Sequence, residues 1–193
     1  MCSSDLYPIR DALGLITDRV VDVLRAIAAF ARRERSRACL GYTHLQPAQL
    51  TTVGKRACLW LQDFQLDFAQ LQHVHANLRF RGLKGATGTQ ASYLELFNGD
   101  HRKVLALEQR VARACGFDTV FPVAGQTYPR KLDAQIIGCL AGIAQSVSKM
   151  TNDIRYLQSV GELEEPFGRK QIGSSAMAYK RNPMRSERAD SLA

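Results

Sequence analysis

Hydrophobic residues recur along this chain in long stripes with helical spacing. The first stripe, spaced alternately four and three residues apart, contains Ile9, Leu13, Ile16, Val20, Val23, Ile27 and Phe30. A stripe with the same rhythm contains Ile136, Leu140, Ile143, Val147, Met150, Ile154 and Leu157. A less regular stripe between them contains Val53, Ala57, Trp60, Phe64, Phe68, Leu71 and Leu78. A mean spacing of about 3.5 residues is typical of helices that pack side by side at a shallow angle. The pattern therefore predicts an all-α fold, an elongated bundle of long helices.

Shorter elements and loops lie between and after these stripes. The chain predicts shorter helices over residues 90–97, 101–114 and 184–193. A loop of small residues spans 84–89, and a loop rich in Gly, Lys, Arg and Ser spans 161–183. A loop as long as the second one is usually functional or disordered. No segment is predicted to form a β-sheet.

Composition narrows the class of protein. The 193 residues are 46% hydrophobic and 23% charged, as in ordinary globular proteins, and no apolar run approaches the length of a membrane-spanning helix. The five cysteines are scattered and form no C-x-x-C pair, which argues against a disulfide framework or a zinc site and favours a reducing cytoplasm. The net charge of +8 suggests an anionic partner: nucleic acid, a membrane surface or a small polyanion. A solvated basic surface is the plainer alternative.

Polar segments that interrupt the helices carry the candidate chemistry. Residues 41–49 include His44, and an imidazole exchanges protons near neutral pH. Residues 123–131 include Gln126 at a predicted helix N-terminus, where free backbone N–H groups favour anions. The last segment, residues 173–183, contains Ser174, Lys180 and Asn182. A hydroxyl beside a cation and an amide is the basis of an activated nucleophile or base. Taken singly, each segment is explained better by a helix cap or a basic surface loop than by a functional site.

The order and wording of these segments resemble the fumarase/aspartase superfamily. Its signature loop reads roughly G-S-S-x-M-P-x-K-x-N, and residues 173–182 match it except that Ala178 replaces the Pro. We use the name signature loop for residues 173–182. The motif T-H-x-Q-P-A-Q is matched over residues 43–49, and K-G-x-T-G-T-Q-A-S over residues 84–92. Without the proline the loop is expected to be more flexible.

Two further matches point to the adenylosuccinate lyase family within the superfamily. These are G-Q-T-Y at residues 125–128 and M-R-S-E-R at residues 184–188. The resemblance implies β-elimination that releases fumarate from adenylosuccinate and from the succinyl-carboxamide ribotide SAICAR, with no cofactor and no metal. It implies Ser174 as general base and His44 as general acid. The substrate-binding residues that it implies are Thr43, Gln126, Lys180, Asn182 and Arg188.

The resemblance also implies an organisation for the chain. Residues 7–193 would be the central helical domain of the lyase, incomplete at both ends, and residues 1–6 a non-native or truncated edge. The family pools loops from different subunits of a homotetramer, so this chain alone is expected to be inactive. A small anionic nucleotide then explains the basic charge, without a membrane or nucleic-acid partner.

Other functions stay open at this stage. They are another lyase of the superfamily such as argininosuccinate lyase, a catalytically dead scaffold of the same fold, and a basic helical nucleic-acid-binding module. Against the last, apolar stripes occupy the helix faces and no nucleic-acid-binding motif is present.

Overall fold

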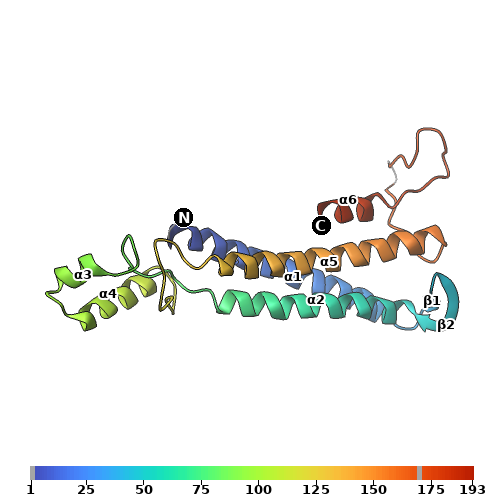
Figure 1. The fold of residues 1–193 in the computed structure, drawn as a ribbon. Helices are drawn as coiled ribbons and strands as arrows, with labels where there is room; N and C mark the ends of the chain where they lie inside the picture. The colour runs from blue at the N-terminus through green and yellow to red at the C-terminus, as the bar shows by residue number, and fades with distance from the viewer. Residues whose placement is uncertain (1–2, 169–170) are drawn as a thin grey trace. The chain divides into compact units, whose positions relative to one another are not determined.

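The computed structural model describes residues 3–168 and 171–193, and long helices dominate it (Figure 1). The long helices are α1 (Leu6–Arg33), α2 (Val53–Ala76) and α5 (Lys131–Ser159). At about 1.5 Å per residue they are roughly 36–44 Å long. The shorter helices are α3 (Ala91–Leu96), α4 (His101–Ala114) and α6 (Met184–Leu192). The predicted helical class is confirmed, and every predicted helix is present within a few residues of its expected bounds.

A β-hairpin between α1 and α2 is the feature that the sequence did not predict. Strand β1 (Ala38–Thr43) pairs antiparallel with β2 (Gln46–Thr52). His44 and Leu45 form the connecting turn with φ angles of 51° and 60°. Positive φ at both central residues is typical of the type I′ turn, whose twist matches that of a hairpin. Because such turns usually contain Asn and Gly, a His-Leu pair gives no sequence signal for one.

The chain divides into two compact units, and each long helix contributes residues to both. The first unit comprises residues 1–21 and 68–139, and the second comprises residues 22–67 and 140–193. In the first unit, the rings of Phe80 and Phe117 lie 5.4 Å apart and are each 3% exposed. Tyr7 meets Phe117 edge-on at 5.7 Å, and the guanidinium of Arg10 lies 5.1 Å from the Phe117 ring. Aromatic packing therefore joins the start of α1 to the loops that follow α2 and α4.

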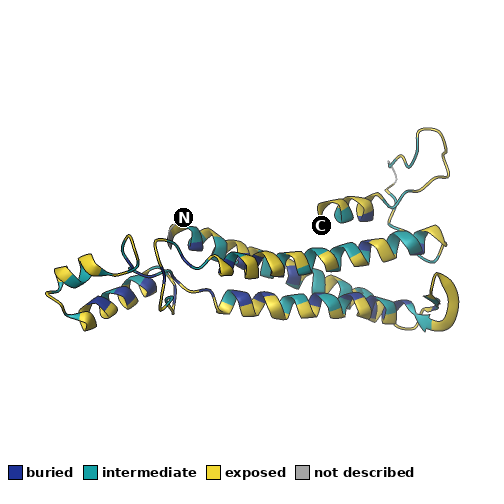
Figure 2. Cartoon of the chain, in the orientation of Figure 1, coloured by how far each residue is buried: buried dark blue, intermediate teal, exposed yellow. Residues whose placement is uncertain are grey.

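The second unit has its own core, in which segments of α1, α2 and α5 pack together. Its buried members are Ala31, Ala57, Trp60 and Leu157. Partly buried residues packed around them are Ile27, Phe30, Met150, Ile154 and Leu163. The indole of Trp60 also donates a hydrogen bond to Asp153 at 2.8 Å, and Lys149 pairs with Asp63 at 2.7 Å. Buried positions thus recur along these helices between exposed ones (Figure 2).

The remaining features of the fold concern the termini, the thiols and the helix lengths. The sequence analysis set residues 1–6 apart as an N-terminal edge. Met1 and Cys2 lie outside the described residues, and Ser3–Asp5 form the short helix η1. Leu6 is the first residue of α1 and is fully buried. The described cysteines, Cys39, Cys58, Cys115 and Cys139, form no disulfide with one another. Within the described ranges no helix combines the length and the apolar character needed to span a bilayer.

Candidate active site

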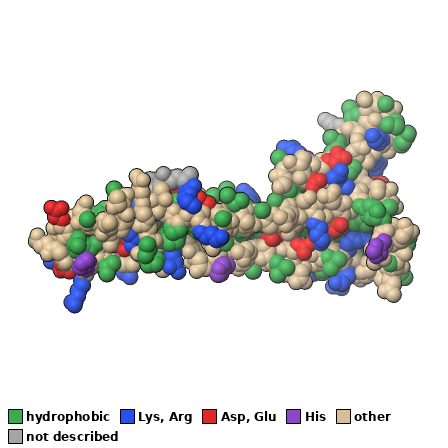
Figure 3. Space-filling model, in the orientation of Figure 1, with side chains coloured by type: hydrophobic (Ala, Val, Ile, Leu, Met, Phe, Trp, Pro, Cys, Tyr) green, Lys and Arg blue, Asp and Glu red, His purple; other side chains and the backbone are tan. Residues whose placement is uncertain are grey.

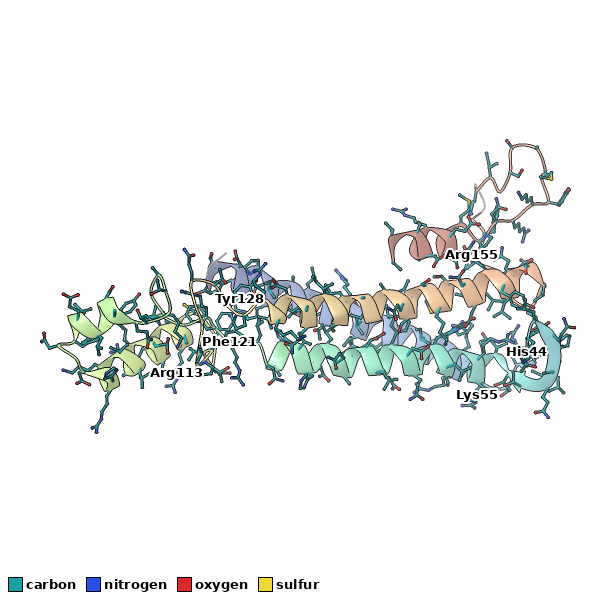
Figure 4. The ribbon with its side chains drawn as sticks, viewed as in Figure 1. His44, Lys55, Arg113, Phe121, Tyr128 and Arg155 are labelled. Atoms are coloured by element: carbon teal, nitrogen blue, oxygen red, sulfur yellow. The ribbon has the colours of Figure 1, made fainter. Side chains whose placement is uncertain are left out.

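The turn of the hairpin carries the candidate general acid. Thr43 ends β1, and the exposed His44 follows it in the turn (Figure 4). The hydroxyl of Tyr156 on α5 donates to the carbonyl oxygen of Leu45 at 3.4 Å. The His44 side chain makes no hydrogen bond to any residue in the ranges 3–168 and 171–193. The backbone of the turn is therefore anchored to α5, while the imidazole is presented to solvent.

A cavity of about 360 Å³ lies between the hairpin, α2 and α5. Its lining includes Tyr42, Lys55, Arg56, Asp153 and Tyr156. The rings of Tyr42 and Tyr156 meet edge-on at 5.9 Å. Burial raises the pKa of Tyr42, and the nearby Glu162 carboxylate adds to the shift. Arg56 donates to the carbonyl oxygen of Leu40, which ties α2 to β1. With Lys55 and Arg56 in its wall, the cavity beside the turn is suited to an anionic group.

The signature loop holds the candidate general base in a defined backbone environment. The Ser174 hydroxyl oxygen accepts hydrogen bonds from the N–H groups of Ala176 and Met177, at 3.3 and 3.2 Å. Backbone donors aimed at an oxygen stabilise negative charge on it. The loop therefore supplies part of what a serine needs to act as a base.

The two ends of the signature loop close on each other. The amide of Asn182 donates to the carbonyl oxygen of Gly173 at 3.2 Å. A Cβ added to Gly173 would collide with the carbonyl oxygen of Lys180, so no larger residue fits there without displacing the loop. Ser174, Lys180 and Asn182 are thereby brought into one short turn of chain, although the Lys180 side chain is exposed.

Two side chains outside the recognised motifs fasten the signature loop and α6 to the rest of the second unit. Gln158 donates to the carbonyl oxygen of Arg181 at 3.0 Å and accepts from the backbone of Glu165 at 3.1 Å. The Glu165 carboxylate accepts from the N–H groups of Arg185 and Ser186 at the start of α6, at 3.0 and 2.8 Å. Burial alone would raise the pKa of Glu165, but the hydrogen bonds from Ser186 and Arg185 outweigh it and leave the pKa below its ordinary value. Glu165 thus caps α6, which carries Arg188.

Helix α6 is held along its length as well as at its start. The Asp190 carboxylate accepts from Ser148, Asn152 and Arg155 on α5, at 2.6, 3.1 and 3.0 Å. The side chain of Arg188 is exposed on the same short helix. The helix therefore presents a cation from a fixed backbone.

Gln126 belongs to the first unit. It is exposed, while Ala124 and Tyr128 on either side are 8% and 2% exposed. The Tyr128 hydroxyl donates to Asp133 at 2.8 Å. Burial raises the pKa of Tyr128, and the hydrogen bond to the Asp133 carboxylate raises it further. Gln126 therefore projects from a short segment whose flanks are anchored.

The predicted site residues fall into four groups. Thr43 and His44 lie on the hairpin, and the signature loop contains Ser174, Lys180 and Asn182. Arg188 lies on α6, and Gln126 lies in the first unit. Among the described residues, no hydrogen bond or ion pair links His44 to the signature loop. The sequence missed Gln158, at the end of an apolar stripe, and Glu165, in the loop that follows it, because such polar residues give no sign of a distant partner.

Comparison with known proteins places the chain in a family. It belongs to the lyase family, whose model matches residues 8–193. Within that class it is 51% identical over 191 residues to the adenylosuccinate lyase of Saccharomyces cerevisiae and 50% identical over 192 residues to that of Schistosoma mansoni. Each match covers 99% of this chain and 40% of the relative, so the chain spans about two fifths of the relatives' length. The predicted resemblance is confirmed.

Solved structures agree with the helical fold. A fumarate lyase from Mesorhizobium sp. BNC1 matches with a TM-score of 0.70 and 29% identity, over 83% of this chain and 36% of that one. The 3-carboxy-cis,cis-muconate lactonizing enzyme from Pseudomonas putida matches with a TM-score of 0.79 and 25% identity, over 97% of this chain and 40% of that one.

Proposed function

We propose that this chain is the central helical part of a lyase that cleaves adenylosuccinate to AMP and fumarate, and SAICAR to AICAR and fumarate. The observation that carries the proposal is the 51% identity to an adenylosuccinate lyase across 99% of the chain. The site residues of this chain agree with it, because they combine hydroxyls, an imidazole and two cations, Lys180 and Arg188. A substrate with a phosphate and two carboxylates also suits the net charge of +8.

Ser174 is the base that removes the proton from Cβ of the succinyl group. A proton beside a carboxylate is barely acidic, so negative charge must be stabilised as the proton leaves. A serine hydroxyl is itself a weak base unless its alkoxide is stabilised. The N–H groups of Ala176 and Met177 supply that stabilisation at Ser174. The Lys180 ammonium and the Asn182 amide stabilise the charge that develops on the substrate carboxylate.

His44 is the acid that protonates the departing nitrogen. Its place in a hairpin turn leaves the imidazole exposed on a backbone anchored by Tyr156. Positioned acids and bases typically contribute about 10²–10⁴-fold to turnover. Substrate binding falls to Thr43, Gln126, Lys180, Asn182 and Arg188.

The complete enzyme is a homotetramer in the cytoplasm, whose active sites combine loops from different subunits. Apolar residues on the long helices support association. Leu59 and Leu66, seven residues apart on α2, are 52% and 63% exposed in the single chain, and Ile137 on α5 is 65% exposed. Residues seven apart share one helix face, so a partner helix can cover both leucines. A light-scattering mass equal to one chain would count against this assembly.

The test uses the protein encoded by the uninterrupted open reading frame. Fumarate release from adenylosuccinate and from SAICAR is followed by ultraviolet absorbance. Ser174→Ala and His44→Asn should each lower turnover by roughly 10²–10⁴-fold. The matched control is Ser175→Ala, since Ser175 is exposed and lies next to the proposed base; it should lower turnover far less. Near-normal turnover of Ser174→Ala would refute the assignment of the base.

The nucleic-acid alternative receives less support. On the face shown in Figure 3, Lys and Arg side chains are interspersed with Asp and Glu rather than gathered in one patch. Competition between adenylosuccinate and duplex DNA for the protein separates the two functions. A protein that binds DNA tightly and ignores adenylosuccinate would favour the alternative.

A further inference from the structure

The loop of residues 84–90 packs directly against the segment that carries Gln126. Gly88 has a φ of 88°, and a Cβ added to it would collide with the carbonyl oxygen of Ala124 and approach Gly125 Cα to 3.2 Å. Any residue with a side chain would therefore push the two backbones apart. The resemblance includes this loop but gives it no role.

A single guanidinium joins the loop to that segment. Arg81 donates to the carbonyl oxygen of Gly125 from Nη2 at 2.7 Å and from Nε at 3.2 Å. The same Nη2 donates to the carbonyl oxygen of Gly85 at 2.7 Å. Hydrogen bonds from an ionised donor are shorter and stronger than neutral ones. Arg81 therefore fixes the peptide immediately before Gln126 onto the loop.

The loop is itself held by a buried network from α4. The Lys84 ammonium lies 2.9 Å from Glu108 Oε1, and the two side chains are 5% and 2% exposed. Gln90 donates to Glu108 at 3.1 Å and to the carbonyl oxygen of Leu83 at 2.9 Å. The backbone N–H of Gln90 also donates to the carbonyl oxygen of Lys84 at 3.0 Å, which closes the base of the loop. Arg81 therefore donates to a loop that a buried ion pair and hydrogen bonds hold in place.

The far side of the Gln126 segment is anchored independently. Tyr128 is 2% exposed and donates to Asp133 at 2.8 Å. Between this anchor and the peptide held by Arg81, only Gln126 and Thr127 remain, and Gln126 is exposed. Arg81 is thus the side chain that holds the peptide next to Gln126 through hydrogen bonds.

We infer that Arg81 is a positioning residue that acts through the Gly125 carbonyl to hold Gln126 ready for substrate. The inference rests on the proposed function, in which Gln126 binds substrate. Without the guanidinium the segment gains conformational freedom that the substrate must remove on binding. Removing the guanidinium should therefore weaken substrate affinity rather than slow the chemical step. The removal should have no further effect on affinity in a variant whose residue 126 can no longer bind substrate.

The experiment compares Arg81→Ala, Gln126→Ala, the double variant and the control Arg110→Ala in the uninterrupted protein. Arg110 is an exposed arginine on α4, and among the described residues no hydrogen bond or ion pair joins its side chain to the 84–90 loop. Arg81→Ala should raise KM about tenfold with kcat changed by less than about threefold, as expected for a lost charged hydrogen bond. The double variant should have the KM of Gln126→Ala, and Arg110→Ala that of wild type. Arg81→Lys keeps the charge and should lie between wild type and Arg81→Ala.

A second readout is independent of activity. Hydrogen–deuterium exchange at the amides of residues 125–127 should quicken in Arg81→Ala and stay unchanged in Arg110→Ala. Unchanged exchange in both Arg81→Ala and Arg81→Lys would overturn the inference even if the protein released no fumarate. The inference would also be overturned if the increases in KM caused by Arg81→Ala and Gln126→Ala multiplied in the double variant. A Gln126→Ala variant with the KM of wild type would overturn it as well. Absence of fumarate release from wild-type protein would instead defeat the proposed function, and the exchange rates would still decide whether Arg81 holds the segment.

Discussion

Replacing Lys84 by Met tests the buried ion pair that supports the first unit. The Lys84 ammonium lies 2.9 and 3.1 Å from the two carboxylate oxygens of Glu108. Met has a similar length but no charge, so among the described residues the Glu108 carboxylate would keep only the Gln90 amide as a donor, at 3.1 Å. Removing one partner of a buried pair typically destabilises a protein by about 3–5 kcal/mol. Because Gln90 remains, we expect Lys84→Met to lower the free energy of unfolding by about 3 kcal/mol.

The double variant Lys84→Met/Glu108→Leu separates burial from pairing. Apolar residues of similar volume often replace a buried pair at little net cost, so its unfolding free energy should lie within about 1–2 kcal/mol of wild type. The control is Lys103→Met, since Lys103 is 66% exposed and lies 3.8 Å from Asp100; it should change stability by less than about 0.5 kcal/mol. Urea unfolding followed by circular dichroism at fixed protein concentration measures all three. A cost below about 1 kcal/mol for Lys84→Met, or a double variant less stable than that single one, would refute the reasoning.

Three further variants test other contacts by the same measurement. Trp60→Phe removes the 2.8 Å hydrogen bond to Asp153 and should destabilise by about 1–2 kcal/mol. Glu165→Gln removes the charged cap of α6. Hydrogen bonds from Ser186 outweigh burial and lower the pKa of the Glu165 carboxyl. The stability that the Glu165 charge contributes is therefore present above the ordinary pKa of 4.5 and is lost as the pH falls through the lowered pKa. The difference between wild type and Glu165→Gln should therefore shrink in acid. Leu45→Gly places glycine at a φ of 60° and should stabilise by about 0.5 kcal/mol.

Each of these variants has an outcome that would contradict its premise. A fully stable Trp60→Phe would mean that Asp153 finds water as readily as the indole. A pH-independent gap for Glu165→Gln would show that the carboxylate charge does not hold α6. Destabilisation by Leu45→Gly would mean that the leucine side chain, which is 68% exposed, makes contacts worth more than the strain that glycine relieves.

The helices could be predicted because their signals are local. Helix α4 begins and ends where the sequence placed it, since Asp100 accepts from the N–H groups of Arg102 and Lys103 and caps the first turn. Gly116, with a φ of 75°, turns the chain away soon after the last residue of α4. Capping side chains and glycine at a positive φ act within one turn of the helix that they bound. Such signals can be read from neighbouring residues alone.

The hairpin could not be predicted because its strands pair locally through a His-Leu turn that gives no sequence signal. The supports of the site could not be predicted because their partners lie far along the chain. The carbonyl oxygen of Leu45 accepts a hydrogen bond from the Tyr156 hydroxyl, 111 residues along the chain. The guanidinium of Arg81 donates to the carbonyl oxygen of Gly125, 44 residues along the chain. In both cases the acceptor is a backbone carbonyl, which every residue possesses. Spacing and residue type therefore carry no trace of the pair, and strand β2 adds no alternation because most of it is exposed.

The sequences of the motifs identified the candidate catalytic residues. Hydrogen bonds to the backbone explain how these residues are held in position for the proposed reaction. Ser174 and Gln126 lie on segments that the core does not bury, and hydrogen bonds to the main chain hold both segments. A hydroxyl on such a loop contributes little to folding, since water can replace it as the partner of two exposed N–H groups. A core contact such as the hydrogen bond from Trp60 to Asp153 contributes more to stability than to turnover. Its loss weakens the helix packing and leaves the reacting groups in place. Variants of the loops should therefore lose turnover while keeping the fold, and this separation is what allows kinetic losses at Ser174 to be attributed to chemistry.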